Sequence, residues 1–160
     1  MSAITIGYTG TTTVNDYGNP NQTILSVGFA ANDTGTIDTI VLNVHANITG
    51  LKVGTFYGSG ANRTERAHVL LGNVVGTGTH TFEGLSLAVE QGDVIGHYCA
   101  SGSLNANIGG VSNYWLNGDK FDGQSYTYTT IYFETKIMLY GTGTTVSAIL
   151  ANRGLFTFHG

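Results

Sequence analysis

The stretch Leu85–Cys99, LSLAVEQGDVIGHYC, carries the pattern that decides the fold class. Apolar residues alternate with small or polar ones on both sides of an interruption at 91–93, QGD. A period of two is typical of β-strands, and a Gly-Asp pair between two such runs is typical of a tight turn. The stretch therefore predicts a β-hairpin, and the apolar face of that hairpin must be buried against another sheet.

The composition favours the same class. The 160 residues include 24 glycines and 23 threonines, and only 10% of them are charged, against about 25% in ordinary soluble domains. Thr, Tyr, Val and Ile favour strands, whereas the strong helix formers Glu, Lys and Arg are scarce. A surface with so few charges is hydrated by hydroxyls and amides or is covered in an assembly, and we expect an assembly.

Alternating apolar runs recur along the chain between turns rich in Gly and Asn. The runs cover residues 4–8, 25–29, 36–46, 51–57, 68–75 and 126–140, and a Gly-Thr segment at 141–145 ends the last one. The charged segment 63–66 is expected to be a solvated loop, and 100–123 an irregular region with one short strand at 114–116. The sequence thus predicts an all-β domain at 1–145, an antiparallel β-sandwich of about eight to ten strands with a jelly roll as the favoured arrangement.

The last segment, 146–160, is unusually apolar for the end of a chain. Chain ends fray unless something holds them. This segment is therefore expected either to add a last strand to the domain or to dock on a neighbouring subunit. Its candidate assembly residues are Leu150, Leu155, Phe156 and Phe158.

Charge and hydropathy exclude two kinds of partner. The formal net charge is −4, and the six Lys and Arg residues are scattered, so no nucleic-acid partner is expected. No apolar run approaches the roughly 20 residues of a membrane-spanning helix, and no membrane partner is expected. The first residues lack the basic and apolar regions of a secretory signal. The protein is therefore expected to be made in a cytoplasm.

No catalytic or metal-binding motif stands out. The five histidines show neither an HxH nor an HExxH spacing, which favours isolated residues over the metal site of a jelly-roll enzyme. A Gly-x-Ser-x-Gly elbow and a phosphate-binding loop are also missing. Cys99 is the single cysteine, and its apolar strand predicts a buried, inert thiol. We expect no enzymatic activity, no catalytic residue, no metal and no cofactor.

The segment Asn117–Gly123, NGDKFDG, resembles part of a calcium loop. A complete EF-hand loop needs a glutamate at position 12, and the residue there is Tyr128. A turn in which aspartate side chains bond nearby backbone N–H groups is the better interpretation.

Aromatic residues near this turn are candidates for glycan binding, because an exposed ring can stack on a sugar while its polar neighbours bond hydroxyls. The candidate residues are Tyr114, Trp115, Asp119, Tyr126 and Tyr128. The competing interpretation, which we favour, is that Trp115 fills the core and the tyrosines form cross-strand pairs.

Four segments occur in the order VGTFYGSG (53–60), FEGLSLAV (82–89), GDVIG (92–96) and LYGTG (139–143). This series resembles an uncharacterised family of Gly/Thr-rich β-domains of tailed-phage virion proteins, and it covers a little over half of the chain. The resemblance implies a virion-associated protein, and it supplies no catalytic residues.

Composition and resemblance together predict a non-enzymatic virion structural protein, with a capsid decoration or capsid-surface protein of a tailed phage as the first choice. Its expected partners are copies of itself, as a trimer or other homo-oligomer, and a major capsid or tail protein. The alternative is a carbohydrate-binding module, or a receptor-binding accessory domain of a tail or fibre, whose partner is a glycan.

Overall fold

The computed structural model describes residues 3–10, 15–17, 20–108, 113–131 and 135–145. Fourteen strands and no helix occur in these ranges, and all pairings between the named strands are antiparallel. The predicted all-β antiparallel class is confirmed, although the strands are more numerous than the eight to ten expected. The finer jelly-roll assignment stays a prediction. Within the same ranges no helix is long and apolar enough to cross a membrane.

The strand β4 (Gly35–Ser59) runs through both halves of the molecule and has 25 residues. Its first half pairs with β14 (Leu139–Thr145), β6 (Gly78–Phe82) and β7 (Leu87–Val89), and its second half pairs with β5 (Asn62–Val74) and β8 (Val94–Tyr98). Between the halves the pairing register shifts at 48–51, where Gly50 has a φ of 64°. Glycine adopts this conformation without strain, so the strand can bend from one layer into the other.

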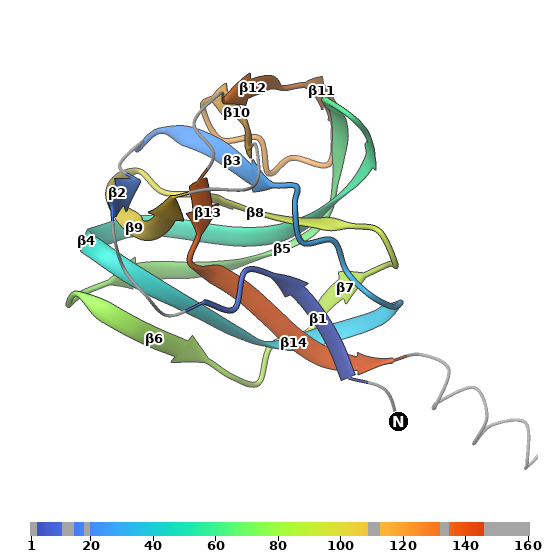
Figure 1. The fold of residues 1–160 in the computed structure, drawn as a ribbon, viewed down its shortest axis with the longest axis horizontal. Coiled ribbons are helices and arrows are strands. Elements are labelled where there is room, and N and C mark those ends of the chain that lie inside the picture. Colours follow the sequence, from blue (N-terminus) through green and yellow to red (C-terminus); the bar gives the residue numbers. More distant parts are fainter. Residues whose placement is uncertain (1–2, 11–14, 18–19, 109–112, 132–134, 146–160) are drawn as a thin grey trace, which may run out of the picture.

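The lower sheet contains β1 (Ala3–Gly7), β14 and the first half of β4, which lie side by side in Figure 1, and also β6 and β7, which follow one another along the other edge of that half of β4. β9 (Ser101–Ile108) continues this sheet beside β4, and it also pairs with the short strands β2 (Asn15–Tyr17) and β13 (Thr135–Ile137). The lower sheet thus joins the first strand of the chain to the last described one.

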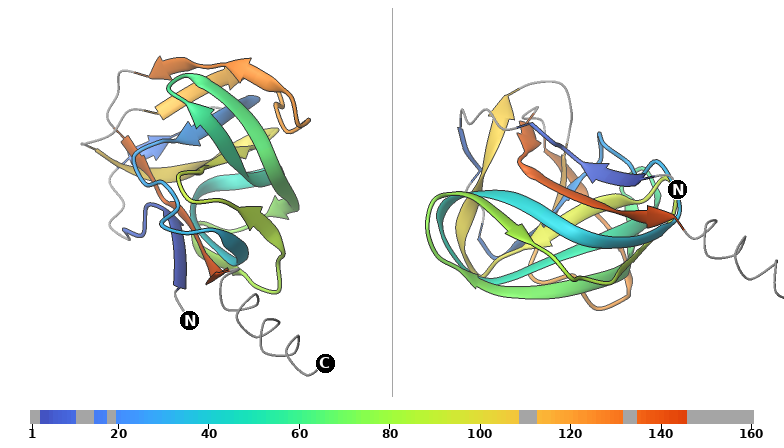
Figure 2. Two further views of the ribbon diagram at one scale, coloured as in Figure 1. Left: turned by 90° about the vertical axis from the view of Figure 1, so that its right-hand side faces the viewer. Right: turned by 90° about the horizontal axis from the view of Figure 1, so that it is seen from below.

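The upper half closes on itself as a small barrel. Its pairings run from β5 to β4, β8, β3 (Gln22–Ser26), β10 (Asn113–Asn117) and β12 (Thr129–Ile131). The strand β11 (Ser125–Thr127), which is separated from β12 by one residue, pairs with β5 and completes the ring. Figure 2 shows these last two strands arching over the upper end. We call this part the upper barrel.

Two apolar cores follow from the alternation of the strands. The main core lies between the lower sheet and the facing wall of the upper barrel, and it includes Ile37, Leu42, Val53, Ile95 and Leu104. The second core fills the barrel interior with Leu25, Phe56, Val94, Phe121 and Tyr128. Two glycines make room for these rings: a Cβ atom at Gly96 would lie 2.5 Å from Leu25 Cδ2, and one at Gly54 would lie 2.7 Å from Phe121 Cε1.

The predicted hairpin at 85–99 is wrong, although its turn is present. β7 pairs with 35–37 in the lower sheet, whereas β8 pairs with 52–56 and with β3 in the upper barrel. Gly92 has a φ of 92°, and an Asp93 carboxylate oxygen accepts a 2.9 Å hydrogen bond from the Glu90 N–H. Two alternating runs around a turn can form a hairpin or an arch between layers, and the spacing is the same in both. Here both runs pair with β4 instead of with each other: β7 pairs with its first half and β8 with its second half.

Three segments predicted as irregular are strands instead. Residues 63–66 belong to β5, because Arg66 and Glu65 have buried or half-buried partners and need no solvated loop. The region 100–123 contains β9 as well as the expected short strand β10. Residues 141–145 continue β14, since Gly143 allows a close approach in which a Cβ atom would lie 1.8 Å from Thr36 O.

Two titratable side chains lie in or beside the main core. Cys99 is 2% exposed, which confirms that its thiol is buried, and this burial raises the pKa of the thiol to about 11. Burial lowers the pKa of His97 to about 4, and its Nδ1 atom has no hydrogen-bond partner among the described residues. Both groups are held in their neutral forms by the surrounding apolar side chains.

His97 should make the fold sensitive to acid. Between pH 6.5 and about 4 the imidazole takes up a proton in the unfolded chain but not in the folded one, so stability falls as the pH falls through this window. The loss from this group is on the order of 3 kcal/mol. Urea unfolding of wild type and His97→Leu at pH 7 and pH 4.5 measures it. The wild type should lose more stability than the variant, and equal losses would contradict the assignment.

Candidate functional site

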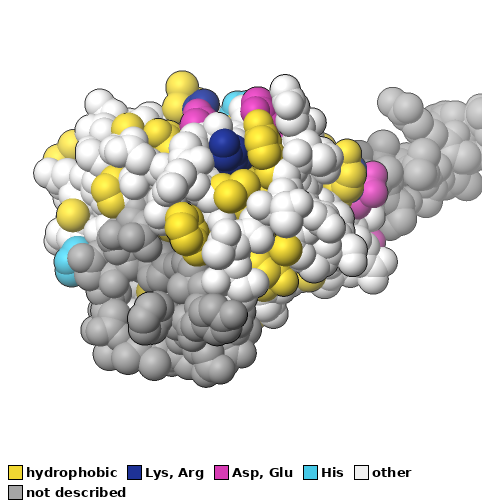
Figure 3. Space-filling model, turned by 90° about the horizontal axis from the view of Figure 1, so that it is seen from above, with side chains coloured by type: hydrophobic (Ala, Val, Ile, Leu, Met, Phe, Trp, Pro, Cys, Tyr) yellow, Lys and Arg dark blue, Asp and Glu magenta, His cyan; other side chains and the backbone are white. Residues whose placement is uncertain are grey.

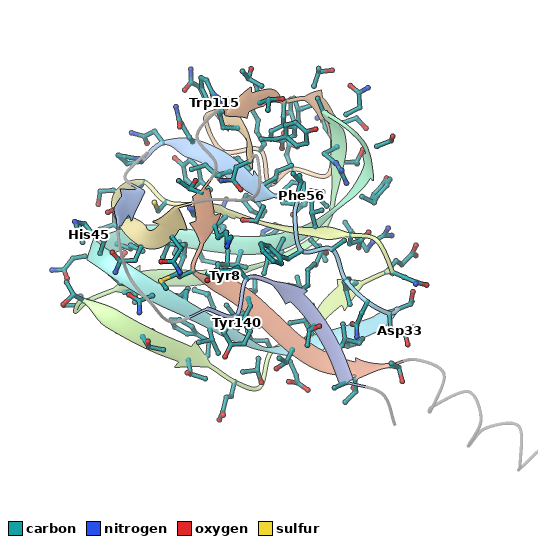
Figure 4. All side chains as sticks on the ribbon, in the orientation of Figure 1. Tyr8, Asp33, His45, Phe56, Trp115 and Tyr140 are labelled. Carbon is teal, nitrogen blue, oxygen red and sulfur yellow. The ribbon has the colours of Figure 1, made fainter. Side chains whose placement is uncertain are left out.

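The aromatic residues that the sequence offers as candidates for glycan binding do not form one surface. Tyr114 and Trp115 are neighbours on β10, so their side chains point to opposite faces of the strand. Tyr114 packs against the second core and Trp115 against the main core, and both are half-buried. Figure 4 shows Trp115 near β10 and β12 at the outer end of the barrel. The two rings therefore cannot stack on the same sugar.

Tyr128 is a core residue. Its side chain is 4% exposed inside the upper barrel, and its ring meets that of Phe56 edge-on at 6.4 Å between centroids. Burial raises the pKa of its hydroxyl, which has no hydrogen-bond partner among the described residues. Tyr128 therefore acts as an apolar filler between β11 and β12, away from any ligand in solvent.

Tyr126 and Asp119, the remaining candidates, are occupied by neighbouring side chains. The Tyr126 hydroxyl donates to Asp122 Oδ2 at 2.5 Å, which lowers the pKa of Asp122 and raises that of Tyr126. Lys120 Nζ lies 4.7 Å from the centroid of the Tyr126 ring. Asp119 forms an ion pair with Lys52. These contacts engage the hydroxyl and one face of Tyr126 and the carboxylate of Asp119.

The turn at 117–123 behaves as its sequence predicts. The Phe121 N–H donates to Asp119 Oδ1 and the Gln124 N–H donates to Asp122 Oδ1, each at 3.0 Å. These are the aspartate-to-backbone bonds of an Asx turn. The resemblance to a calcium loop thus has a local explanation in turn geometry.

Several of the charged groups in the described part of the chain form ion pairs within the molecule. Arg66 holds the buried carboxylate of Asp93 with two hydrogen bonds of 2.6 and 3.1 Å, lies 3.2 Å from Glu90, and stacks on Tyr57. His68 pairs with the buried carboxylate of Glu65. Figure 3 shows the charged side chains of the barrel end scattered among uncharged atoms. The surface is therefore even poorer in unpaired charge than the composition indicates.

The histidines do not gather into a metal site in the part of the chain that the structure describes. No group of three His, Cys, Asp or Glu side chains could hold a metal ion there. His97 is in the core, His68 pairs with Glu65, and His80 Nε2 lies 2.8 Å from the Gly76 carbonyl oxygen. His159 lies outside the described residues.

The feature of the surface that stands out is an open strand edge. On the side away from β4, β5 is paired with β11 only at 62–64, and no other described strand pairs with it. We call residues 67–75, AHVLLGNVV, the free edge. Leu70 is 63% exposed and Val75 is 73% exposed, and both belong to this segment.

Such an edge is normally protected by charges, proline or a covering element, because its N–H and C=O groups can pair with another chain. The free edge carries no proline and no Asp, Glu, Lys or Arg, and this charge-free run continues to Phe82. The run itself can be read in the sequence. Its position on an edge cannot, because that depends on where the distant strand β11 stops pairing.

Comparisons with models of known protein families and with curated proteins find no match for this chain. The candidate assembly residues Leu150, Leu155, Phe156 and Phe158 lie outside the described residues. The free edge is therefore the candidate functional site that the described part of the chain offers.

Replacing Trp115 by Ala should weaken the fold. Its half-buried indole packs against the main core, so its loss should lower the free energy of unfolding by about 2–3 kcal/mol in urea denaturation. The control Leu70→Ala, at an exposed strand position, should change it by less than about 0.5–1 kcal/mol. If the free energy of unfolding of Trp115→Ala were unchanged, the indole would again be a candidate for ligand binding.

Proposed function

We propose that this protein is a non-enzymatic structural protein that works by assembling with copies of itself through the free edge. The observation that carries the proposal is the combination, on the far side of β5 and at its C-terminal end, of backbone groups paired with no described strand, exposed Leu70 and Val75, and no Asp, Glu, Lys or Arg. Apolar side chains and open hydrogen-bonding groups are what a strand of another chain needs for pairing.

A second copy of the chain is the occupant that the charges favour. When two free edges pair, no Asp, Glu, Lys or Arg of one copy faces another of the same sign, because the segment has none. Pairing along β5 would hydrogen-bond the open backbone groups and cover the exposed side chains of Leu70 and Val75 in both copies. Homo-oligomerisation thus removes two exposed apolar groups from water in each subunit.

The virion setting of the proposal comes from the resemblance of the four Gly/Thr-rich segments to tailed-phage β-domains. A protein on a capsid surface needs repeated contacts with its own copies or with a lattice, and it needs no catalytic group. The free edge and the low content of charged residues are consistent with that role. A capsid or tail protein is then the second partner in the proposal.

Two charges placed on the free edge should break the assembly. In Leu70→Lys/Val75→Lys, like charges would meet across the pairing, and the self-association constant should fall by at least about tenfold. Light scattering behind a sizing column measures the mass. The wild type should have at least twice the mass of one chain and the double variant the mass of one chain.

The control for this test is Thr129→Lys, which adds a charge at an exposed strand position on β12, away from the free edge. It should assemble as the wild type does. Thermal melting of all three proteins checks that they fold. A monomeric wild type, or a double variant that still assembles, would overturn the role given to the free edge.

A further inference from the structure

The outward face of the lower sheet is lined by hydroxyls and amides, without charged side chains in its central rows. Tyr140 of β14, Val41 of β4 and Thr81 of β6 are neighbours across three strands. In the next row Asn43 of β4 lies beside Thr79 of β6. These side chains point away from the main core, because they alternate with the buried residues of the same strands.

A shallow depression of about 70 Å³ opens in this face. Its apolar lining comes from Val41 and Met138, its aromatic ring from Tyr140, and its polar lining from Asn43 and Thr79. Figure 4 shows Tyr140 on β14 in the broad face formed by the lower sheet, far from Trp115 at the barrel end. The depression is thus separate from the aromatic residues that the sequence singles out.

A chain of hydrogen bonds fixes the polar side of the depression. Asn105 Nδ2 donates to Asn43 Oδ1 at 2.6 Å, and Asn43 Nδ2 donates to Thr79 Oγ1 at 3.1 Å. His45 Nδ1 lies 3.0 Å from Asn105 Oδ1 and orients the Asn105 side chain, at the far end of this hydrogen-bond network. The Asn43 amide and the Thr79 hydroxyl are therefore held in place before any ligand arrives, which reduces the entropy that binding costs.

This network of hydrogen bonds leaves two donor hydrogens for a ligand. Thr79 Oγ1 accepts from Asn43, so the hydroxyl proton of Thr79 remains to be donated. Asn43 uses one of its two amide hydrogens toward Thr79, so the second remains as well. The depression therefore offers two donors beside the aromatic residue Tyr140, and none of the residues that line it carries a charge.

We propose that this depression binds one ring of a neutral sugar, with the Tyr140 ring against the apolar face of the sugar and Asn43 and Thr79 donating to its hydroxyls. The uncharged lining disfavours phosphorylated, sulfated and carboxylated ligands, because an anion would lose hydration without gaining a counter-charge. The depression has a volume of about 70 Å³, less than that of a whole sugar, so it would receive part of a single ring at the end or side of a glycan. This site is independent of the free edge and of assembly.

The test is a titration of ¹⁵N-labelled full-length protein with the methyl glycosides of glucose, galactose, mannose and N-acetylglucosamine, up to 50 mM each, followed by amide chemical shifts. At least one glycoside should shift the amides of residues 41–43, 79–81 and 138–140 in a saturable way. Thr79→Val, which keeps the shape of the side chain and removes its hydroxyl, should weaken that binding at least fivefold. Tyr140→Thr, which retains a strand-forming residue, should abolish it.

Two controls separate this site from the others. Tyr114→Ala at the barrel end and Leu70→Lys/Val75→Lys on the free edge should bind the sugar as the wild type does. Thermal melting shows whether Tyr140→Thr folds, and Thr79→Val keeps the test decisive if it does not. Shifts at the barrel end, unchanged binding by Thr79→Val, or no shift with any of the four glycosides would overturn the proposal.

Discussion

The continuous strand β4 is the constraint on which the rest of the structure depends. Its first half supplies the centre of the lower sheet and its second half supplies a wall of the upper barrel. Because one backbone is shared, the bend at 48–51 sets the angle between the two layers and hence the shape of the main core between them. The remaining strands add to one end of β4 or the other.

Ion pairs are a second set of contacts that hold the fold together. The ion pairs of Arg66 with Asp93 and of Lys52 with Asp119 join segments far apart in the chain, so these charges act inside the fold. Threonine, asparagine and small apolar residues make up large parts of the exterior. A charge-poor exterior binds a partner at a low cost in desolvation, since hydroxyls and amides lose less hydration free energy than ions do. The free edge and the depression beside Tyr140 both follow from this distribution.

Local pattern was enough to predict the all-β class, the turn at Gly92, the Asx turns at Asp119 and Asp122, and the inert thiol of Cys99. Each of these depends on a few adjacent residues. The pairing partners were not predictable, because alternation tells which face of a strand is buried and not which strand lies beside it. Aromatic rings adjacent in the sequence suggest a glycan site, but adjacent residues of a strand point to opposite faces, and Tyr114 and Trp115 do so. Tyr140, Asn43 and Thr79 meet only across three strands, and no local signal links them.

The register of β1 bears on how the chain reaches its native state. Ala3 pairs with Thr144 and Ile6 with Gly141, so the first strand has its partner at the other end of the described chain. The barrel, likewise, closes only when β11 reaches β5, some sixty residues upstream in the chain by the pairing of Ser125 with Thr64. A nascent chain emerging from the ribosome therefore carries β1 unpaired, and the barrel open, until β14 and β11 have been synthesised. Such a chain completes its fold only after these strands emerge, and during that interval its unpaired strands can associate with those of neighbouring chains.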